Sequence, residues 1–297
     1  MTGSEAIYGG VELGGTKCIA VLARGPNDII ARETVPTTGP DETLKALEQI
    51  LLGWREAQDF AALGIASFGP IDLHPDSPTW GRVLTTTKPG WSGADIAPRL
   101  AKRFDVPVGF ETDVNGAAIA EMRWGAGRDM RDFAYITVGT GVGVGLVVNG
   151  LPTRGFLHSE LGHVRVAQRP SDAWAGVCPF HGACVEGLAS GPAIAARIAP
   201  RTFDQLPGDD PVWDSVAWAL AQLCHDIVCA AAPGAIAFGG GVIQRQPHLL
   251  PRIERMLIGS LTDYMPLPRS EGYVVPAVLG ANAGPLGAIA LAMDARA

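Results

Sequence analysis

The chain has 297 residues, of which 47% are hydrophobic and 18% are charged, and this suits one large or two modest globular domains. It carries 23 Lys and Arg against 30 Asp and Glu, a formal net charge of −7, and no run rich in Lys or Arg. Because nucleic-acid binding depends on clustered cations, we expect no nucleic-acid partner.

Export and membrane insertion are also disfavoured by the sequence. Residues 1–10 lack the charged and apolar regions of a secretory signal. The longest apolar stretches, around 134–148 and 227–243, are interrupted by Gly or Pro and are too short to span a bilayer. The five Cys are an odd number, which argues against a disulfide framework. We therefore expect a cytoplasmic globular protein with no membrane partner.

The first part of the chain alternates apolar runs of strand length with helical patterns. Leu44, Leu47 and Leu51 recur at intervals of three or four, which predicts a helix that Asp41 is placed to cap. Residues 68–98 are rich in Gly and Pro and predict a long loop, which in a compact domain is usually functional. In chain order we expect strands at 7–13, 17–23 and 28–35, a helix over 41–58, strands at 62–67 and 105–110, and a helix over 113–124.

The pattern begins again at Phe133. A strand at 133–138, a Gly-rich turn and a strand at 142–148 match the proportions of residues 8–22, which indicates two domains that open with the same hairpin. Any two hairpins with Gly-rich turns would look alike, so the repeat is a weak signal by itself. We then expect a loop over 150–184, a helix from about 186, a helix over 212–232, a strand at 235–238 and a final helix near 285–296.

Three glycine clusters are candidates for phosphate binding, because Gly lets backbone N–H groups approach a phosphate closely. None matches a P-loop or a G-x-G-x-x-G motif, and each alone is an ordinary tight turn. Two such turns at matching places in a repeat, facing each other, would hold a triphosphate from both sides. The clusters are Gly14-Gly15-Thr16-Lys17, Gly139-Thr140-Gly141-Val142-Gly143 and Gly239-Gly240-Gly241.

A metal site is predicted by the spacing of two Cys and two His. Cys178, His181 and Cys184 follow one another at intervals of three, and His163 lies 15 residues before Cys178. Four such ligands are what a structural zinc ion requires, and a closed site leaves no position for catalysis. The alternative is that the Cys are simply buried and His181 lies on the surface. Cys18, Cys224 and Cys229 have no partner at such a spacing and are expected in the core.

Three carboxylates lie close to these motifs. Asp113 opens a predicted helix, where an N-cap is its ordinary role. Glu160 comes three residues before His163, and Glu186 comes two residues after Cys184. If zinc binds, these two glutamates are held near each other and become candidates for orienting a ligand. Each taken alone would be a surface residue.

In their order along the chain, these motifs resemble the ROK family (repressor, open reading frame, kinase) and, within it, the bacterial fructokinase branch. The resemblance runs from Tyr8 to about residue 290 and implies an actin-like ATPase (ribonuclease H-like) fold, an α/β fold with two α/β domains around a cleft. Residues 1–116 and 284–297 would form the smaller domain, and 117–283 the larger one with the zinc-binding loop. The motifs are Glu12-Leu-Gly-Gly-Thr-Lys, Ser67-Phe-Gly-Pro, Thr112-Asp-Val-Asn-Gly-Ala-Ala, Gly139-Thr-Gly-Val-Gly, Glu160-Leu-Gly-His and Cys178-x2-His-x2-Cys-x-Glu-Gly.

The family implies ATP-dependent phosphorylation of a hexose with Mg²⁺ bridging the phosphates. Asp113 would be the general base that accepts the proton of the attacking sugar hydroxyl. Gly14, Gly15, Thr16 and Lys17 would form the first phosphate loop, Gly139, Thr140 and Gly141 the second, and Gly239, Gly240 and Gly241 would border the adenosine. Gly69, Thr112, Asp113, Glu160, His163 and Glu186 would contact the sugar, and His163, Cys178, His181 and Cys184 would bind zinc.

Two departures from the family pattern bear on the substrate. Glu12 stands where the family usually has Asp, which leaves its relation to Mg²⁺ open. Thr112 replaces the Asn that precedes the base in glucose-preferring members, and the loop around Lys88 also lacks an Asn typical of them. Because a missing amide would weaken glucose binding, we expect D-fructose as the substrate, with mannose or glucose weaker.

Two other functions are disfavoured by the same residues. A sugar-responsive repressor would need an N-terminal winged helix-turn-helix, for which a first strand at residue 7 leaves no room. A zinc hydrolase would need an open coordination position. The alternatives that stay open are a glucokinase, a mannokinase or an N-acetylhexosamine kinase, and, in another class, a non-catalytic sugar-binding module. A homodimer is expected on family grounds.

Overall fold

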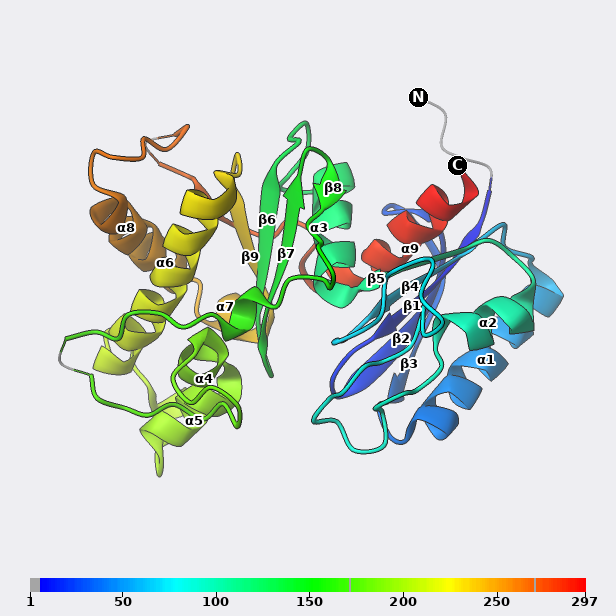
Figure 1. The fold of residues 1–297 in the computed structure, drawn as a ribbon, viewed down its shortest axis with the longest axis horizontal. Helices are drawn as coiled ribbons and strands as arrows, with labels where there is room; N and C mark the ends of the chain where they lie inside the picture. The colour runs from blue at the N-terminus through cyan, green and yellow to red at the C-terminus, as the bar shows by residue number, and fades with distance from the viewer. Residues whose placement is uncertain (1–5, 171, 270) are drawn as a thin grey trace. The chain divides into compact units, whose positions relative to one another are not determined.

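A computed structural model of the protein describes residues 6–170, 172–269 and 271–297, which form two compact units (Figure 1). The first unit holds the described residues up to Trp124, together with Thr153–His158 and Ala281–Ala297. The second holds the described residues of Gly125–Pro152 and Ser159–Gly280. The first boundary lies after Trp124, where the sequence suggested 116, because the intervening helix packs against the last helix of the chain.

The sheet of the first unit has the strand order β3-β2-β1-β4-β5. Antiparallel pairing joins β1 to β2 and β2 to β3, whereas β1, β4 and β5 are parallel neighbours. The strands are β1 (Tyr8–Leu13), β2 (Lys17–Gly25), β3 (Asp28–Pro36), β4 (Leu63–Ser67) and β5 (Val108–Thr112). The helices are α1 (Pro40–Ala57), α2 (Ala97–Phe104), α3 (Asp113–Trp124) and α9 (Ala283–Arg296), and the 3₁₀ turn η3 (Gly280–Asn282) precedes α9.

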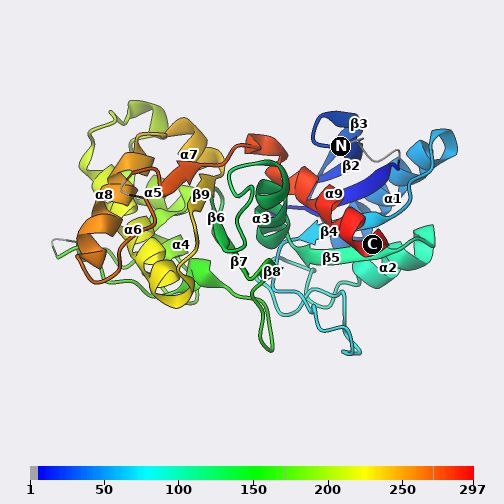
Figure 2. The ribbon, with the colours of Figure 1, turned by 90° about the horizontal axis from the view of Figure 1, so that it is seen from above.

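A row of glycines lets α9 lie close against this sheet. Gly10, Gly64 and Gly109 are directly opposite one another on β1, β4 and β5. A Cβ at Gly64 would overlap the Ala288 carbonyl of α9, and one at Gly109 would overlap the Leu291 carbonyl. The last helix therefore returns to the first unit and packs backbone to backbone on its sheet, as both views show (Figure 1, Figure 2).

The opposite face of this sheet is covered by α1 and α2. Leu44, Leu47 and Leu51 of α1 are fully buried in a core shared with Leu100 and Phe104 of α2. The predicted helix is confirmed, but its cap is not Asp41. Gly39 is the N-cap and Pro40 fits the first helical position, whose N–H needs no intrahelical partner, so Asp41 lies in the first turn. Helix α2 was not predicted, and the strand expected at 105–110 begins only at Val108.

The second unit has a sheet with the order β10-β9-β6-β7-β8. Its core lies between this sheet and α6, whose Val216, Leu220 and Leu223 are fully buried. The strands are β6 (Phe133–Val138), β7 (Val142–Val148), β8 (Leu151–Pro152), β9 (Ile236–Gly239) and β10 (Val274–Pro276). The helices and 3₁₀ turns are η1 (Leu161–His163), α4 (Val185–Ala189), α5 (Gly191–Ile198), η2 (Phe203–Gln205), α6 (Pro211–Ala231), α7 (Gly241–Arg245) and α8 (Leu249–Leu261).

The internal repeat is confirmed by the topology. Written from the opposite edge, the second sheet is β8-β7-β6-β9-β10, which matches β3-β2-β1-β4-β5 strand for strand. Each sheet starts with an antiparallel hairpin, and in each the fourth strand in chain order pairs in parallel with the first strand. The two Gly-rich turns, after β1 and after β6, therefore occupy equivalent places in the two units.

In the part of the chain that the structure describes, no helix combines the length and the apolar character that crossing a membrane requires.

Candidate functional site

In the first unit, one edge of the sheet gathers the predicted residues. Leu13, Ser67 and Thr112 are the last residues of β1, β4 and β5, and they lie opposite one another in the parallel register. The residues that follow them, Gly14, Phe68 and Asp113, therefore leave the sheet at the same edge. In sheets with parallel strands this is where ligands bind. The first phosphate turn, Gly69, Thr112 and Asp113 are thus brought to one place by strand register alone.

The turn between β1 and β2 is tightly fixed, yet it is exposed. The Gly14 N–H donates to the Lys17 carbonyl at 3.1 Å, which closes the turn. Its neighbour Thr37 donates its N–H to the Thr16 carbonyl at 3.0 Å and its hydroxyl to the Gly14 carbonyl at 2.8 Å. Gly15, Thr16 and Lys17 are exposed to solvent. The turn is therefore a rigid platform with accessible N–H groups, which suits a phosphate.

Asp113 is the first residue of α3, and its neighbour fills the role of N-cap. The Thr112 hydroxyl accepts the N–H of Asn115 at 3.2 Å, which is the ordinary capping bond. The Asp113 carboxylate accepts the N–H of Val114 at 2.9 Å and is half-buried. These two hydrogen bonds fix Asp113 in the first turn of α3, directly after the end of β5.

Glu12 is positioned at the start of α9. A Cβ at Gly284, in the first turn of that helix, would overlap the Glu12 carboxylate, so the glycine makes room for the longer acid. Burial raises the pKa of Glu12, and the positive charges of Lys17 and Arg32 oppose that rise. The extra methylene of Glu12, relative to Asp, thus brings its carboxylate against a helix N-terminus.

The second and third glycine clusters meet at one edge of the sheet in the second unit. β6 and β9 are parallel neighbours in which Thr137 lies opposite Gly239, so the turn after Val138 and the turn after Gly239 lie side by side. The turn after β6 is closed by the Gly139 N–H, which donates to the Gly141 carbonyl at 2.9 Å. The Gly191 N–H of α5 donates to the Gly139 carbonyl at 2.7 Å, which anchors the turn to the helical layer.

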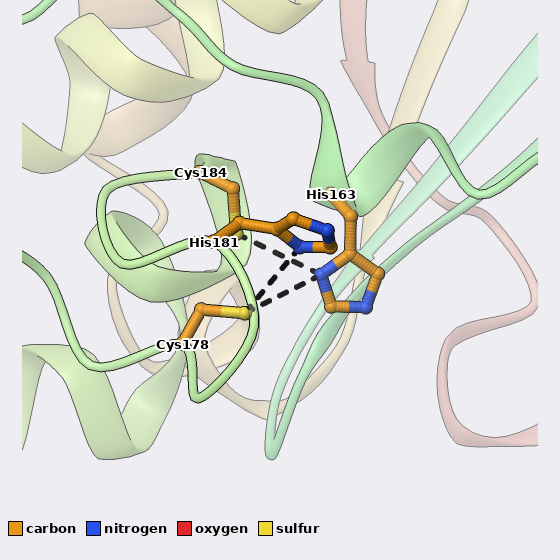
Figure 3. A group of neighbouring side chains, drawn as sticks. All are labelled: His163, Cys178, His181 and Cys184. Atoms are coloured by element: carbon orange, nitrogen blue, oxygen red, sulfur yellow. Dashed lines mark hydrogen bonds between the residues drawn. The ribbon is translucent and has the colours of Figure 1, made fainter. Parts of the chain in front are cut away.

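The predicted Cys and His ligands form a compact cluster (Figure 3). One ligand atom from each of His163, Cys178, His181 and Cys184 lies within 4.8 Å of all the others. Three distances between a thiol sulfur and an imidazole Nδ1 in this cluster are each 3.7 Å. Zinc bond lengths of about 2.3 Å to sulfur and about 2.0 Å to nitrogen give a distance of about 3.5 Å between the sulfur and nitrogen atoms of a tetrahedral site. The donors and their spacing therefore fit zinc.

Short backbone pairings hold these ligands in place. Cys178 and Gly182 pair across a tight turn, and Arg165 pairs with Cys184, which ties the segment after His163 to the start of α4. Both sulfurs are buried, and burial raises the pKa of Cys184 to about 11. A bound divalent cation would favour the thiolate instead.

Glu186 links this cluster to the second phosphate turn. Its Oε1 lies 3.9 Å from His163 Nε2, the imidazole nitrogen on the side away from the thiols. Its Oε2 accepts the N–H of Val142 at 3.1 Å, and a Cβ at Gly141 would come within 2.6 Å of that oxygen. Glu160 is exposed and its carbonyl accepts the His163 N–H at 3.0 Å. The sequence did not reveal that Glu186 contacts the turn.

A second set of residues near Asp113 was also missed. Glu111, only 1% exposed, accepts the side-chain amide of Asn115 at 3.1 Å and pairs with Arg154. The His158 Nε2 accepts the N–H of Ile71 at 3.0 Å. These contacts attach Thr153–His158 to the first unit. A Glu in a short strand, two residues before Asp113, is the one sequence signal for this set.

Comparison with known proteins identifies the class to which this fold and site belong. The sequence pattern of the ROK family matches residues 8–295. The chain therefore belongs to the ROK family, and its two sheets with their helices are the two α/β domains of an actin-like ATPase fold.

Individual relatives match along almost the entire chain. The fructokinase of Pediococcus pentosaceus is 38% identical over 289 residues, which cover 97% of this chain and 98% of that protein. The crystal structure of a ROK hexokinase from Thermus thermophilus aligns with a TM-score of 0.79 at 27% identity, over 97% of this chain and 98% of that one. A ROK family glucokinase from Streptomyces griseus, solved in complex with glucose and AMPPNP, aligns with a TM-score of 0.75 at 27% identity, over 97% and 99%.

Proposed function

We propose that the protein transfers the γ-phosphoryl group of ATP to D-fructose and forms fructose 6-phosphate. The observation that carries this function is the position of Asp113, which leaves the sheet at the same edge as the Gly14–Lys17 turn. The 38% identity to a fructokinase along 97% of the chain supports fructose as the sugar. The protein is thus a phosphotransferase that acts on a hexose.

In the proposed reaction, Asp113 is the general base. Its carboxylate accepts the proton of the sugar hydroxyl while that oxygen forms a bond to the γ-phosphorus. The bond between the γ-phosphorus and the bridging oxygen breaks, and ADP leaves with the electron pair. Mg²⁺, when bound with the nucleotide, neutralises phosphate charge. The polypeptide supplies the base, the positioning of the sugar and the N–H groups of the turns.

The proposed nucleotide contacts are the Gly-rich turns of the internal repeat, each described within its own unit. Gly14, Gly15, Thr16 and Lys17 form an exposed turn in the first unit, and Gly139, Thr140 and Gly141 form the equivalent turn in the second. Gly239, Gly240 and Gly241 lie beside the second turn and are the proposed contacts of the adenosine.

Fructose is favoured over glucose by the residue before the base. The family resemblance implies an Asn there in glucose-preferring members, whereas in this chain the Thr112 hydroxyl is already engaged in capping α3. The remaining proposed sugar contacts are Gly69, Glu160, His163 and Glu186. The two carboxylates would accept hydrogen bonds from sugar hydroxyl groups. The identity of 38% to the fructokinase against 27% to the Streptomyces griseus glucokinase agrees with this preference.

A structural zinc ion completes the second unit. His163, Cys178, His181 and Cys184 supply four ligands, which closes the coordination shell and leaves the metal a role in holding η1 and α4. We expect a cytoplasmic homodimer, because closed two-fold assemblies are the commonest oligomers.

The test is ADP release with MgATP against fructose, mannose, glucose, N-acetylglucosamine and N-acetylmannosamine. Fructose should give the highest kcat/KM. A higher value for another sugar would overturn the fructose assignment and keep the kinase assignment. No turnover with any of the five sugars, by protein that is folded and loaded with zinc, would overturn the kinase assignment and favour a sugar-binding module.

A further inference from the structure

Lys88 carries its ammonium group to the first phosphate turn. It lies in the long loop between β4 and α2, and its Nζ donates a hydrogen bond to the Gly15 carbonyl. The same Nζ lies 4.7 Å from the centre of the Phe68 ring, a cation–π distance. The side chain is half-buried. A backbone acceptor and an aromatic face therefore fix the position of this charge.

The loop segment that bears Lys88 is itself anchored in the core. Trp91 is fully buried and donates its ring N–H to the Thr38 carbonyl at 2.8 Å. Its ring packs edge-on against Phe68 at 5.0 Å, and its backbone N–H donates to the Lys88 carbonyl at 3.2 Å. Lys88 is thus held by a packed loop, which is the support that a charge needs when it must meet a substrate group at a fixed place.

The contacts of Lys88 connect it to the residues that follow two neighbouring strands of the first sheet. β4 is the strand between β1 and β5, so Phe68 leaves the sheet between Gly14 and Asp113. Lys88 touches the residue after β4 and the turn after β1. Asp113 follows β5, the strand beside β4, so Lys88 contacts the residue after the strand next to the one that leads to the proposed base.

The positive charge of Lys88 is not neutralised by a neighbouring acid. Among the described residues, no carboxylate forms an ion pair with it, and Cys18 is the titratable group that interacts with its charge. Burial lowers the pKa of Lys88, because partial removal of the ammonium group from water disfavours its charged form. Lys88 is therefore a half-buried cation without an acidic partner, beside a turn that is proposed to bind phosphate. An anionic ligand at this turn would neutralise its charge.

We propose that Lys88 is a catalytic residue that binds the γ-phosphoryl oxygens during transfer. This inference rests on the proposed kinase function and deepens it. The Gly15 carbonyl takes one of the three N–H donors of the ammonium, and the others face the phosphoryl oxygens, on which charge is spread in the transition state. As the bond to the sugar oxygen forms and the bond to ADP breaks, the proton passes to Asp113 and Lys88 keeps all of its protons.

The first experiment compares Lys88→Met and Lys88→Arg with Lys102→Met, the same change at an exposed position of α2 in the same unit. Loss of a preorganised donor costs about 10²- to 10³-fold in kcat. We expect that loss in Lys88→Met, a smaller loss in Lys88→Arg, and unchanged kcat in Lys102→Met. Unchanged kcat in Lys88→Met, with active wild-type protein, would overturn the inference and leave the kinase function standing.

The second experiment measures nucleotide affinity by calorimetry and needs no turnover. Because Lys88 would contact the γ-phosphoryl group, Lys88→Met should weaken AMPPNP binding and leave ADP binding close to wild type. Equal weakening of both, with a lower Tm, would mean that Lys88 only holds the loop, and the inference would fall. This comparison decides on Lys88 even if the wild-type protein phosphorylates no sugar, an outcome that would overturn the kinase function instead.

Discussion

Glu186 shows how one side chain serves two parts of the second unit. One carboxylate oxygen accepts the Val142 N–H of the phosphate turn, and the other lies 3.9 Å from the His163 imidazole of the metal cluster. If zinc binds as proposed, a carboxylate on the far side of the His163 ring would help to orient that ring. Glu186 would then link the turn after β6 to the metal site, in addition to its proposed contact with the sugar.

This double role predicts different results for two substitutions. Glu186→Ala leaves the Val142 N–H without its acceptor, which costs about 1–3 kcal/mol, so the KM for ATP should rise about tenfold together with the KM for fructose. Glu186→Gln retains an oxygen acceptor, so its KM for ATP should stay near wild type while fructose binding weakens. Steady-state kinetics with each substrate varied in turn measures both. If Glu186→Ala raised only the KM for fructose, the turn would not depend on Glu186.

At this scale, local motifs were predictable and contacts over long sequence distances were not. His163, Cys178, His181 and Cys184 were grouped correctly because their spacing is short and their chemistry specific. The contact of Lys88 with Gly15 joins residues 73 positions apart, and no spacing rule reveals it. The pairing of Glu111 with Arg154 is hidden for the same reason, since it depends on a segment that crosses from the end of β8 to the first unit.

Among the elements, α9 lies close against the sheet of the first unit. Its backbone carbonyls at Ala288 and Leu291 occupy the space where side chains at Gly64 and Gly109 would lie. In this sheet, β1, β4 and β5 are followed by Gly14, Phe68 and Asp113. Packing of α9 therefore stabilises the sheet from which Asp113 and the Gly14–Lys17 turn extend.

A substitution at Gly64 tests this packing. Gly64→Ala inserts a methyl group against the Ala288 carbonyl, and we expect it to lower the free energy of unfolding by about 1–3 kcal/mol. Gly53→Ala is the matched control, because Gly53 lies on an exposed part of α1 with open space around it. That change should stabilise by up to about 1 kcal/mol. Chemical denaturation measures both, and equal stability of the two variants would contradict the close packing.

Element prediction succeeded where the periodicity was strong and failed at prolines. The bounds of α3, β6 and β7 match the expected ranges, because caps and Gly-rich turns mark their ends. Helices α2 and α8 were missed because Pro98 and Pro251 lie within them, and a proline normally signals the end of a helix. Both prolines are in the first turn, where the missing N–H removes no intrahelical hydrogen bond. The short strand β10 has too few residues to show a period.

For the whole molecule, the repeated topology accounts for the pair of phosphate turns. The strand orders β3-β2-β1-β4-β5 and β8-β7-β6-β9-β10 are equivalent, and each hairpin presents a Gly-rich turn at the same place. The remaining chemistry differs between the units. Asp113 and Lys88 belong to the first unit, and the Cys and His cluster with Glu186 belongs to the second. The proposed base thus comes from one half of the repeat, and the proposed metal site with its neighbouring carboxylate comes from the other.

Removal of zinc should therefore reduce stability and sugar affinity together. A chelator frees the segment after His163 from α4, so we expect a lower Tm and weaker fructose binding in treated protein, both restored by added zinc. Cys178→Ser should bind fructose weakly before treatment and respond little to the chelator. Metal analysis provides the direct check. Less than about one zinc per several chains in protein purified at neutral pH would contradict the metal assignment.

The measurement that tests the account most directly compares wild-type protein with Asp113→Asn for formation of fructose 6-phosphate from fructose and MgATP, with fructose binding measured on both by calorimetry. An amide cannot accept the hydroxyl proton, whereas it retains the shape and hydrogen-bonding capacity of the side chain. We predict that kcat falls by about 10²- to 10⁴-fold or more while fructose binding remains measurable. Turnover by Asp113→Asn near the wild-type rate would show that the base is another residue and would contradict the central claim.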